Sequence, residues 1–542
     1  MSKRYDYIVV GAGSGGCAVA ARLSEDRSMR VLLIEAGGSN RKLEVKAPLA
    51  FAKQFHTKLD WDYWTEPESS LNGRRIFSPR GKMLGGCSSM NAMIYIRGNR
   101  LDYDTWAANG AEGWSYDDVL PYFTRAERNE HIHDEYHGSA GPLNVTRIRD
   151  IDPVSSALVD AAANALHVPV NDDFNGSSQD GVGQFQVTQR RGIRFSAREA
   201  YLRSRRRNLT IRTNTLVRKI VLDDGRATGV EVTDRKGNVE RISAAREVIL
   251  AAGAFNTPAL LQHSGIGPAD HLRSVGVAPI VDLPAVGEHL MEHPLVYLTY
   301  ELREGQIGLF DAEDARHLKN WLLRRRGKLA SNVAEAGGHV RTDSSLAAPN
   351  FQVLFAPAFF YNHGAMAWDV PAATIAMSYI APHSRGRVRI RSSDPTRKPT
   401  VTYNMLATDS EMEEMVEAVE LARRVAAASP AHKVLGAEIT PGVEVQSRAD
   451  IAAWIRSSVE HTYHPSCSAR IGSPADGVVD PQLRVHGVAN LRIADASVMP
   501  TIIRGNTNAT AIMIGERCAD FVRADRAAPP TTVGRVSEVG AR

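Results

Sequence analysis

Cysteine, long apolar runs and an excess of charge are all scarce in this sequence. Only 4 of its 542 residues are cysteine, and none forms a C-x-x-C pair. So sparse a set argues against a disulfide framework, and we expect a reducing, cytoplasmic setting and no metal site. No stretch approaches the roughly 18 consecutive apolar residues of a membrane-spanning helix. The first residues show no pattern typical of a secretory signal.

The charge balance is close to neutral, with 65 Lys+Arg against 61 Asp+Glu and a formal net charge of +4. A nucleic-acid-binding protein concentrates basic residues on one face, so this balance predicts no nucleic-acid partner. The arginine clusters at 205–207 and 324–326 leave peripheral membrane attachment as an alternative, although solvated helix ends explain them more simply. Residues 527–542 have no apolar period and are expected to form a disordered tail.

Glycine, by contrast, is plentiful, with 43 residues that gather partly in tight clusters. Gly11, Gly13 and Gly16 form a G-x-G-x-x-G motif that follows an apolar strand at residues 5–10 and opens a helix. The first glycine of this motif allows a tight turn, the second the close approach of a diphosphate, and the third close packing of helix and strand. The motif therefore predicts a βαβ dinucleotide-binding unit, with Ser14 at the anion-binding helix N-terminus.

The acidic residue that completes the motif is Glu35, at the end of a second apolar strand at residues 30–34. Its carboxylate can accept hydrogen bonds from a ribose diol and would repel a 2′-phosphate. NADP is therefore disfavoured, whereas FAD and NAD both remain compatible with this unit.

Two further glycine-rich segments carry a family resemblance. They run RGKMLGGCSSMN at residues 80–91 and GAFNTPALLQHSGIG at residues 253–267. Both resemble signature motifs of the glucose–methanol–choline (GMC) family of FAD-dependent oxidoreductases, and similar stretches continue over about residues 5–524. Within the family the chain is most similar to choline dehydrogenases, choline oxidases and bacterial dehydrogenases of primary aliphatic alcohols.

The resemblance implies an α/β fold with two interleaved domains. A Rossmann-like FAD-binding domain would take residues 1–155, 205–295 and 470–526. A substrate-binding domain built on an antiparallel sheet would take residues 156–204 and 296–469.

The resemblance also assigns the flavin contacts. Gly85 and Gly86 would let loop backbone lie flat against the flavin ring. Some relatives carry a covalent flavin link on a histidine whose position is Met90 here, and a thioether cannot form that link, so we expect non-covalent FAD. The further predicted cofactor-binding residues are Ser88, Asn91, Val217, Asp495, Thr507 and Asn508.

A His-Pro motif near the C-terminus carries the predicted chemistry. Oxidation of an alcohol by hydride transfer needs a base for the hydroxyl proton and a donor that holds the developing alkoxide. In the family these are the histidine of the His-Pro motif and a later His or Asn, which fall on His464 and Asn506. Imidazole suits the base because its pKa of about 6.5 leaves it neutral at pH 7.

The expected substrate pocket is apolar. The segment that contributes an active-site histidine in choline oxidases runs FQVLFAPAFF here, at residues 351–360, and holds no histidine. We therefore expect an aliphatic or aryl primary alcohol, oxidised to an aldehyde, with Phe355, Phe359 and Tyr463 in the pocket. Choline, giving betaine aldehyde, is the alternative substrate, for which Glu335 would add a carboxylate to an aromatic cage.

Two other classes of protein share parts of this pattern. A flavin-binding protein or lyase without alcohol oxidation would keep the cofactor motifs but would not need His464 and Asn506. An NAD-dependent dehydrogenase would share the glycine motif alone. For an alcohol-oxidising flavoprotein, the sequence leaves both O₂ and a quinone-type compound as the electron acceptor.

The cofactor assignment predicts that the purified protein is yellow. Its visible spectrum should be that of an oxidised flavin, because FAD itself carries the hydride-accepting chemistry. Absorption spectroscopy of the protein, before and after incubation with added FAD, checks this expectation. A colourless protein that stays colourless with FAD and binds NAD instead would contradict it.

Overall fold

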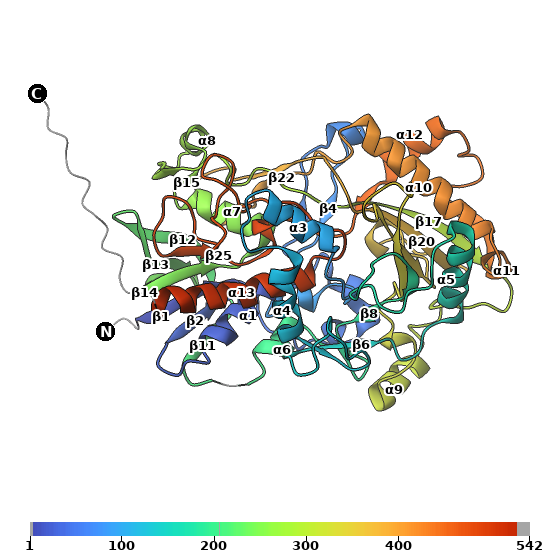
Figure 1. The fold of residues 1–542 in the computed structure, drawn as a ribbon, viewed down its shortest axis with the longest axis horizontal. Helices are drawn as coiled ribbons and strands as arrows, with labels where there is room; N and C mark the ends of the chain where they lie inside the picture. The colour runs from blue at the N-terminus through green and yellow to red at the C-terminus, as the bar shows by residue number, and fades with distance from the viewer. Residues whose placement is uncertain (1–3, 205, 528–542) are drawn as a thin grey trace, which may run out of the picture.

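Two sheets that lie side by side along the long axis organise the molecule (Figure 1). The structure is a computed structural model and describes residues 4–204 and 206–527. One half holds a mainly parallel sheet, and the other holds an antiparallel sheet with helices behind it. The first sheet takes strands from the beginning, middle and end of the chain, so the chain passes between the halves more than once.

The parallel sheet has the order β11-β2-β1-β14, with β25 on the other side of β14. Its strands are β1 (Tyr5–Val10), β2 (Val31–Ile34), β11 (Leu209–Arg212), β14 (Val239–Leu250) and β25 (Leu491–Ile493). The long strand β14 continues into an antiparallel meander with β13 (Arg226–Thr233) and β12 (Leu216–Asp223). Strands β1 and β2 are buried almost throughout, as apolar strands of a sheet covered on both faces should be.

Helix α1 (Ser14–Leu23) approaches its neighbours closely because it begins with glycines. A Cβ on Gly16 would come within 1.9 Å of the carbonyl oxygen of Gly11, and a Cβ on Gly15 within 2.1 Å of that of Ala494. Helix α13 (Asn508–Ala527) packs on α1 through a glycine of its own, since a Cβ on Gly515 would lie 2.4 Å from the oxygen of Gly15. This packing brings the N-termini of both helices to one end of the parallel sheet.

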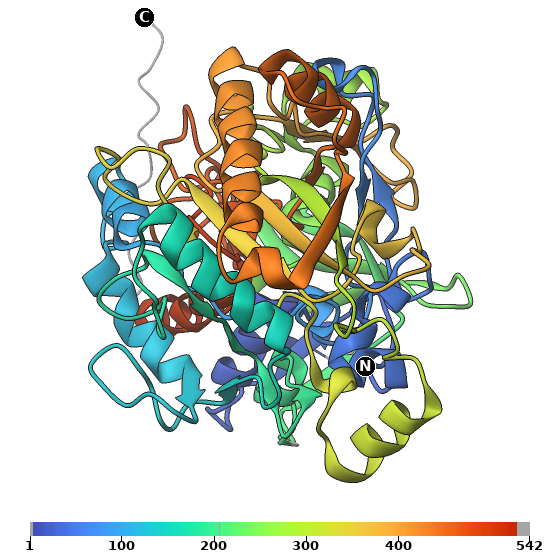
Figure 2. The same cartoon turned by 90° about the vertical axis from the view of Figure 1, so that its right-hand side faces the viewer.

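The antiparallel sheet has the order β23-β17-β20-β19-β18-β7, with β24 beside β17. Its strands are β7 (Gly181–Gln184), β17 (Pro294–Leu302), β18 (Ala336–Val340), β19 (Phe351–Ala356), β20 (Ala372–Tyr379), β23 (Leu435–Thr440) and β24 (Glu460–His461). Helices α5 (Pro153–Leu166) and α10 (Asp409–Ala427) cross its outer face (Figure 2). Side chains of alternate residues, such as Val353 and Phe355, join the apolar core under these helices.

The other helices and short strands lie around the two sheets. The remaining α-helices are α2 (Leu43–Lys46), α3 (Arg100–Ala108), α4 (Tyr116–Ala126), α6 (Ala197–Tyr201), α7 (Gly253–His263), α8 (Ala269–Ser274), α9 (Ala315–Arg324), α11 (Ala431–Val434) and α12 (Arg448–Ser458). Short strands and 3₁₀ turns include β5 (Glu127–Asn129), β6 (Leu143–Arg147), β8 (Gln186–Val187), η1 (Pro48–Gln54) and η3 (Gly86–Ser89). Within residues 4–204 and 206–527, no helix combines the length and the apolar character needed to cross a bilayer.

The sequence-based fold predictions agree with this architecture. The predicted βαβ unit is β1-α1-β2, and the α/β fold with an antiparallel second sheet is confirmed. The strands of the parallel sheet fall inside the segments predicted for FAD binding, and those of the antiparallel sheet inside the other segments, apart from residues 294 and 295 of β17. The domain limits themselves stay a prediction. Of the predicted tail, Ala527 ends α13 and residues 528–542 lie outside the described chain.

A buried carboxylate ties together the helices next to the parallel sheet. Glu516 of α13 is fully buried and accepts hydrogen bonds from three other helices. Its donors are Arg22 of α1 at 2.8 Å, Arg125 of α4 at 2.9 Å and the hydroxyl of Tyr201 of α6 at 2.6 Å. Two partly buried guanidinium groups therefore share this carboxylate, while Arg22 also pairs with Glu25 and Arg125 with Asp520 nearer the surface.

Glu516→Gln is expected to lower the free energy of unfolding by about 2–3 kcal/mol, because the amide keeps the shape but not the charge that both arginines need. Arg448→Ala is the matched control. It removes exposed ion pairs to Glu413 and Glu420 of α10 and should cost less than about 1 kcal/mol. Chemical denaturation of both variants with saturating FAD measures the difference, and equal effects would contradict the assignment.

Candidate active site

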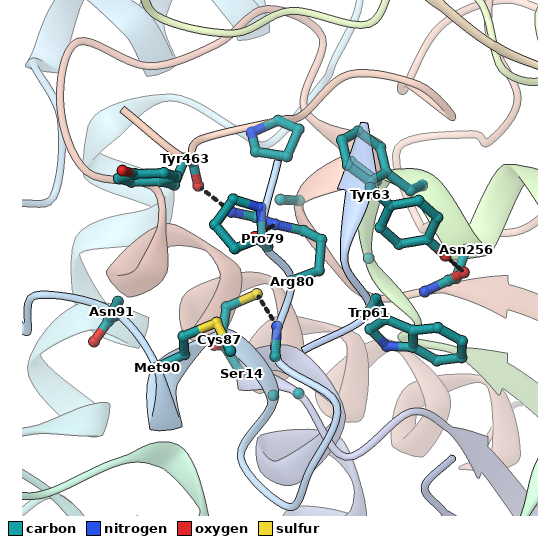
Figure 3. Close-up of a pocket in the computed structure, with 18 of the residues that line it drawn as sticks. Ser14, Trp61, Tyr63, Pro79, Arg80, Cys87, Met90, Asn91, Asn256 and Tyr463 are labelled. Atoms are coloured by element: carbon teal, nitrogen blue, oxygen red, sulfur yellow. Dashed lines mark hydrogen bonds between the residues drawn. The ribbon is translucent and has the colours of Figure 1, made fainter. Parts of the chain in front are cut away.

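A single long cavity lies between the two sheets and is lined by both. The glycines after β1 and the start of α13 border one part of it, and residues of β17, β19 and β20 border the other. In Figure 3, Met90 and Cys87 gather on one side of this cavity, with Trp61 and Asn256 opposite. It is therefore large enough and placed to hold both a dinucleotide cofactor and a small substrate.

Two helix N-termini meet at the nucleotide end of the cavity. Gly11, Gly13 and Ser14 line it from the start of α1, and Thr507 and Asn508 line it from the start of α13. The hydroxyl of Ser14 donates to the Asn508 Oδ1 atom at 2.6 Å, which joins the two ends directly. Free N–H groups and the positive ends of two helix dipoles thus face one place, an arrangement that favours an anion such as a diphosphate.

Glu35 also faces the cavity, from the end of β2. Its carboxylate accepts hydrogen bonds from the main-chain N–H of Ala12 at 2.9 Å and of Gly37 at 2.8 Å. Burial raises its pKa to about 7, although these two hydrogen bonds act in the opposite direction. Each carboxylate oxygen keeps a further lone pair, so the pair of ribose hydroxyls predicted from sequence has acceptors available.

Asp495 reaches the cavity from the loop after β25. Its Oδ2 accepts from the N–H of Gly253 at 2.9 Å and from the hydroxyl of Thr257 at 2.6 Å, and its Oδ1 accepts from the N–H of Ser497 at 2.9 Å. These bonds attach the start of α7 to the segment that follows β25, and so hold two cavity-lining segments together.

The structure brings most of the predicted cofactor residues together and leaves three outside. Gly86, Asn91 and Val217 line the cavity with those already described. The predicted residues that do not line it are Gly16, Gly85 and Ser88. Gly16 serves helix packing instead, and the Ser88 hydroxyl is occupied by the carbonyl oxygen of Gly85 at 2.6 Å. Gly85 adopts φ = 91°, a left-handed conformation that favours glycine. Gly85 and Ser88 therefore determine the backbone shape of the loop at residues 85–89 without facing the cavity.

The two predicted catalytic side chains are in direct contact. Asn506 Nδ2 lies 3.1 Å from His464 Nε2, and both residues line the cavity. Gln352 of β19 donates from its Nε2 to Asn506 Oδ1 at 3.0 Å. Because the amide oxygen is thus occupied, the Asn506 NH₂ group points to His464, and His464 Nε2 must be the acceptor. The ring proton of neutral His464 therefore sits on Nδ1.

A second histidine faces that Nδ1 proton and was not predicted. His293, next to the start of β17, has its Nδ1 3.0 Å from His464 Nδ1, so it accepts the hydrogen bond that the Nδ1–H of His464 donates. Glu292 aligns the pair, since its Oε1 accepts from the main-chain N–H of His293 at 2.9 Å and of His464 at 2.7 Å. A sequence signal existed, because His293-Pro294 repeats the dipeptide His464-Pro465.

Burial keeps both imidazoles neutral. The pKa of His464 is lowered well below its usual range, mainly by burial and further by the neighbouring His293 and the charge of Arg80. Burial likewise lowers the pKa of His293 to about 3. His461, three residues before His464, is fully buried and its Nε2 is bonded to the carbonyl oxygen of Phe77 at 2.8 Å. It supports the loop from behind and does not line the cavity.

Of the four predicted substrate-pocket residues, only Tyr463 lines the cavity. Phe355 does not line the cavity, because strand alternation turns its side chain into the core under α5 and α10, while its neighbours Leu354 and Ala356 face the cavity. Phe359 lies beyond the end of β19 and stacks on Trp368 at 5.6 Å between ring centroids.

Glu335 is likewise outside the cavity. It is buried beside the start of α5, where its Oε2 accepts from the main-chain N–H of Asp152 at 2.8 Å and from the hydroxyl of Ser155 at 2.9 Å. The carboxylate thus satisfies the end of a helix and offers nothing to a substrate.

The substrate end of the cavity has an apolar wall. The lining side chains here are Phe51, Phe55, Leu295, Tyr297, Val333, Leu354, Ala356, Phe360, Thr374 and Ala376. The only carboxylates among all the lining residues are Glu35 and Asp495, which belong to the nucleotide end. A bound alcohol would therefore meet His464 and Asn506 beside a mainly apolar wall, to which residues such as Thr374, Asn332 and Tyr463 add polar groups.

Comparison with known proteins agrees with this geometry. Two family models described as GMC oxidoreductase match residues 5–295 and 382–515. The chain belongs to the GMC oxidoreductase family. A relative from Photobacterium profundum, named oxygen-dependent choline dehydrogenase, is 39% identical and aligns over 96% of this chain and 93% of its own length.

Solved structures of GMC flavoenzymes superpose on most of the chain. Pyridoxine 4-oxidase from Mesorbium loti gives a TM-score of 0.88 at 30% identity and covers 97% of this chain and 100% of its own. A formate oxidase from Aspergillus oryzae RIB40, studied for its FAD modification, gives 0.91 at 27% identity, with 97% and 99% covered. The predictions of FAD as cofactor and of an enzyme acting on CH–OH donors are confirmed by these relationships.

The residues present fit FAD. The cradle at Gly11, Gly13 and the two helix ends has no side chain in the way of a diphosphate, and Glu35 faces the cavity with free lone pairs. Met90 lines the cavity at the position where some relatives carry the flavin-linked histidine, and it is buried. A thioether can pack against a flavin but does not form the covalent link that a histidine forms. Non-covalent binding of FAD therefore stays our prediction.

Acid precipitation of the purified protein should leave all of its FAD in the supernatant, because no nucleophilic side chain stands at position 90. The matched variant Met90→His places an imidazole there and should retain part of the flavin in the pellet. Absorbance and fluorescence of both fractions measure the split. Flavin that stays with the wild-type pellet would show that another residue forms a covalent link.

Proposed function

We propose that this protein oxidises a neutral, mainly apolar primary alcohol to the aldehyde, with His464 as catalytic base and Asn506 as the donor to the alcohol oxygen. The observation that carries this proposal is the contact of 3.1 Å between Asn506 Nδ2 and His464 Nε2 at an apolar part of the cavity. Bound FAD supplies the acceptor for the hydride that leaves the alcohol carbon.

The proton of the alcohol goes to His464 Nε2. This nitrogen is unprotonated in the tautomer that Gln352 and Asn506 impose, and the lowered pKa keeps it so over a wide pH range. His293 accepts the hydrogen bond from Nδ1 and can share the positive charge that forms when Nε2 is protonated. The base is thus prepared for its task before a substrate arrives.

Asn506 holds the oxygen as its O–H bond breaks. Without substrate, one of its N–H groups reaches His464 Nε2; a bound alcohol would take that place, donating its O–H to the single Nε2 lone pair while its oxygen accepts from the Asn506 NH₂ group. A neutral donor fixed in a cavity with few other polar groups stabilises developing negative charge well, because no solvent has to reorganise around it. No further titrating group is required for this step.

The chemistry of the wall favours a neutral substrate. A quaternary ammonium such as choline would have to give up its hydration, and needs a carboxylate or an aromatic cage in return. Glu335, the carboxylate suggested by the sequence, is bonded to Asp152 and Ser155 and lies outside the cavity. Each methylene of an apolar substrate, in contrast, gains about 0.8 kcal/mol on burial.

Choline oxidation remains the second candidate, since the similar protein from Photobacterium profundum is named oxygen-dependent choline dehydrogenase. Tyr463 and Tyr297 line the cavity and could supply aromatic faces. The word oxygen-dependent in that name favours O₂ over a quinone-type compound as the proposed electron acceptor.

Anaerobic flavin reduction by a panel of primary alkanols, aryl alcohols and choline tests the proposal. We expect alkanols and aryl alcohols to bleach the flavin faster than choline does, because the wall offers hydrocarbon and no carboxylate. His464→Ala should slow this reduction about 100-fold or more while FAD stays bound. Admission of O₂ after reduction then shows whether oxygen restores the spectrum.

His486→Ala is the control for the loss of an imidazole. Its Nε2 lies 2.9 Å from the carbonyl oxygen of Gly472, away from the cavity lining, and we expect wild-type reduction rates. Unchanged rates in His464→Ala would rule out His464 as base. A wild-type flavin that no alcohol reduces would support a flavin-binding protein or lyase, and choline as the fastest substrate would select the second candidate.

A further inference from the structure

A row of polar side chains runs from the catalytic pair across the antiparallel sheet. Ser378 of β20, Gln352 of β19 and His339 of β18 stand directly opposite one another on neighbouring strands. Directly opposite residues point to the same face, with Cβ atoms about 4.5–5.5 Å apart. Gln352 lies two residues before the cavity-lining Leu354, so the whole row faces the cavity side of the sheet.

Two neighbouring members of this row are buried and lack protein partners for several atoms. Gln352 and His339 are fully buried. Within the described chain, the Oε1 of Gln352 and both ring nitrogens of His339 have no hydrogen-bond partner. Buried polar groups in native proteins are nearly always hydrogen-bonded, to protein or to ordered water, so an acceptor and a donor side by side call for a shared partner.

His339 is neutral and therefore offers one donor and one acceptor. Burial lowers its pKa to about 3, and the nearby described residues include no carboxylate that acts on it. Its ring is held edge-on by Phe174, with 5.4 Å between the ring centroids. Its ring nitrogens and the Gln352 oxygen, all without a partner in the described chain, therefore stand on directly opposite residues of neighbouring strands.

We propose that His339, Gln352 and Asn506 form a directional hydrogen-bonded chain, joined between His339 and Gln352 by a buried water, that keeps the Asn506 NH₂ group turned to His464. This inference rests on the proposed function of His464 and Asn506. Gln352 and His339 are positioning residues, because neither touches the reacting atoms.

The direction of the chain decides what His464 can do. The water held by His339 donates to the Gln352 oxygen, which leaves the Gln352 NH₂ to donate to Asn506 Oδ1. The Asn506 NH₂ group then donates to His464 Nε2, and that nitrogen has to be unprotonated. If the Asn506 amide turned over, its oxygen would face Nε2 and favour a proton on that nitrogen, which then could not accept one from the alcohol.

Two substitutions of nearly equal size separate this positioning role from a structural one. Gln352→Met removes the donor without supplying an acceptor, so the Asn506 amide loses its fixed direction, and flavin reduction should slow about tenfold. Gln352→Glu supplies a carboxylate that accepts from the Asn506 NH₂ and reverses the amide. It should slow reduction about 100-fold or more at neutral pH.

The pH profile gives a second readout. In the wild type, the lowered pKa of His464 keeps the base unprotonated, and the reduction rate should fall only well below pH 6.5. A carboxylate at position 352 favours the protonated imidazole and raises that pKa, so the acid limb should move to higher pH in Gln352→Glu but not in Gln352→Met. His339→Phe, which keeps a ring against Phe174, should slow reduction about threefold without moving the limb.

Gln184→Met is the matched control for loss of a glutamine amide from this sheet. Gln184 of β7 donates to the carbonyl oxygen of Ile148 at 3.0 Å, away from the catalytic pair, and its loss should leave the rate and pH profile as in the wild type. In an Asn506→Ala background, Gln352→Met should cause no further slowing, because the group that it positions is gone.

Ring-¹⁵N-histidine magnetic resonance spectra make the inference testable without an alcohol. The His464 signal, identified by its loss in His464→Ala, should report a proton on Nδ1 in the wild type and on Nε2 in Gln352→Glu. A wild-type proton on Nε2, or equal rates and pH limbs in all Gln352 variants, would overturn the chain. Failure of every alcohol to reduce the flavin, with the wild-type tautomer as expected, would instead count against the proposed function alone.

Discussion

The close approach of helix α1 to the parallel sheet is the constraint on which the rest of the structure depends. Any side chain at Gly15 or Gly16 would collide with backbone oxygen atoms, so α1 has its present place only because these positions lack a Cβ. Helix α13 then fits against α1 through Gly515, and its N-terminus comes beside that of α1. Since Asn506 stands just before α13, the packing that builds the nucleotide cradle also places the donor of the proposed catalytic pair.

A second constraint is electrostatic and acts on the neighbouring histidines His464 and His293. His464 and His293 are brought together in a place with little water, where burial disfavours a charged ring. Glu292 fixes both residues through their main-chain N–H groups and leaves the two rings to contact one another. A neutral pair with defined tautomers is therefore the resting state that the loops impose.

The sequence reported well on features that depend on short stretches of chain. Glycine spacing and apolar strands predicted the βαβ unit and Glu35, and motif positions predicted His464 and Asn506. Partners that meet through the register of distant strands left almost no local signal, and Gln352 is the clearest case. Phe355 lies on the core face of β19 by strand alternation, and Glu335, which precedes β18, is bonded at the start of α5, so neither lines the cavity. His293 had a local signal, because His293-Pro294 is the same dipeptide as His464-Pro465.

The alternation of side chains in the antiparallel sheet has a consequence for how this enzyme can change. In β19, residues 352, 354 and 356 face the cavity side, while residues 351, 353 and 355 fill the core under the helices. The same division continues in β20, where residues 374 and 376 line the cavity and residues 375 and 377 do not. The residues that contact a substrate and the residues that stabilise the fold thus alternate along one strand. Substitutions of the cavity-facing side chains can change which alcohol is bound, while the core-facing side chains continue to hold the sheet against the helices.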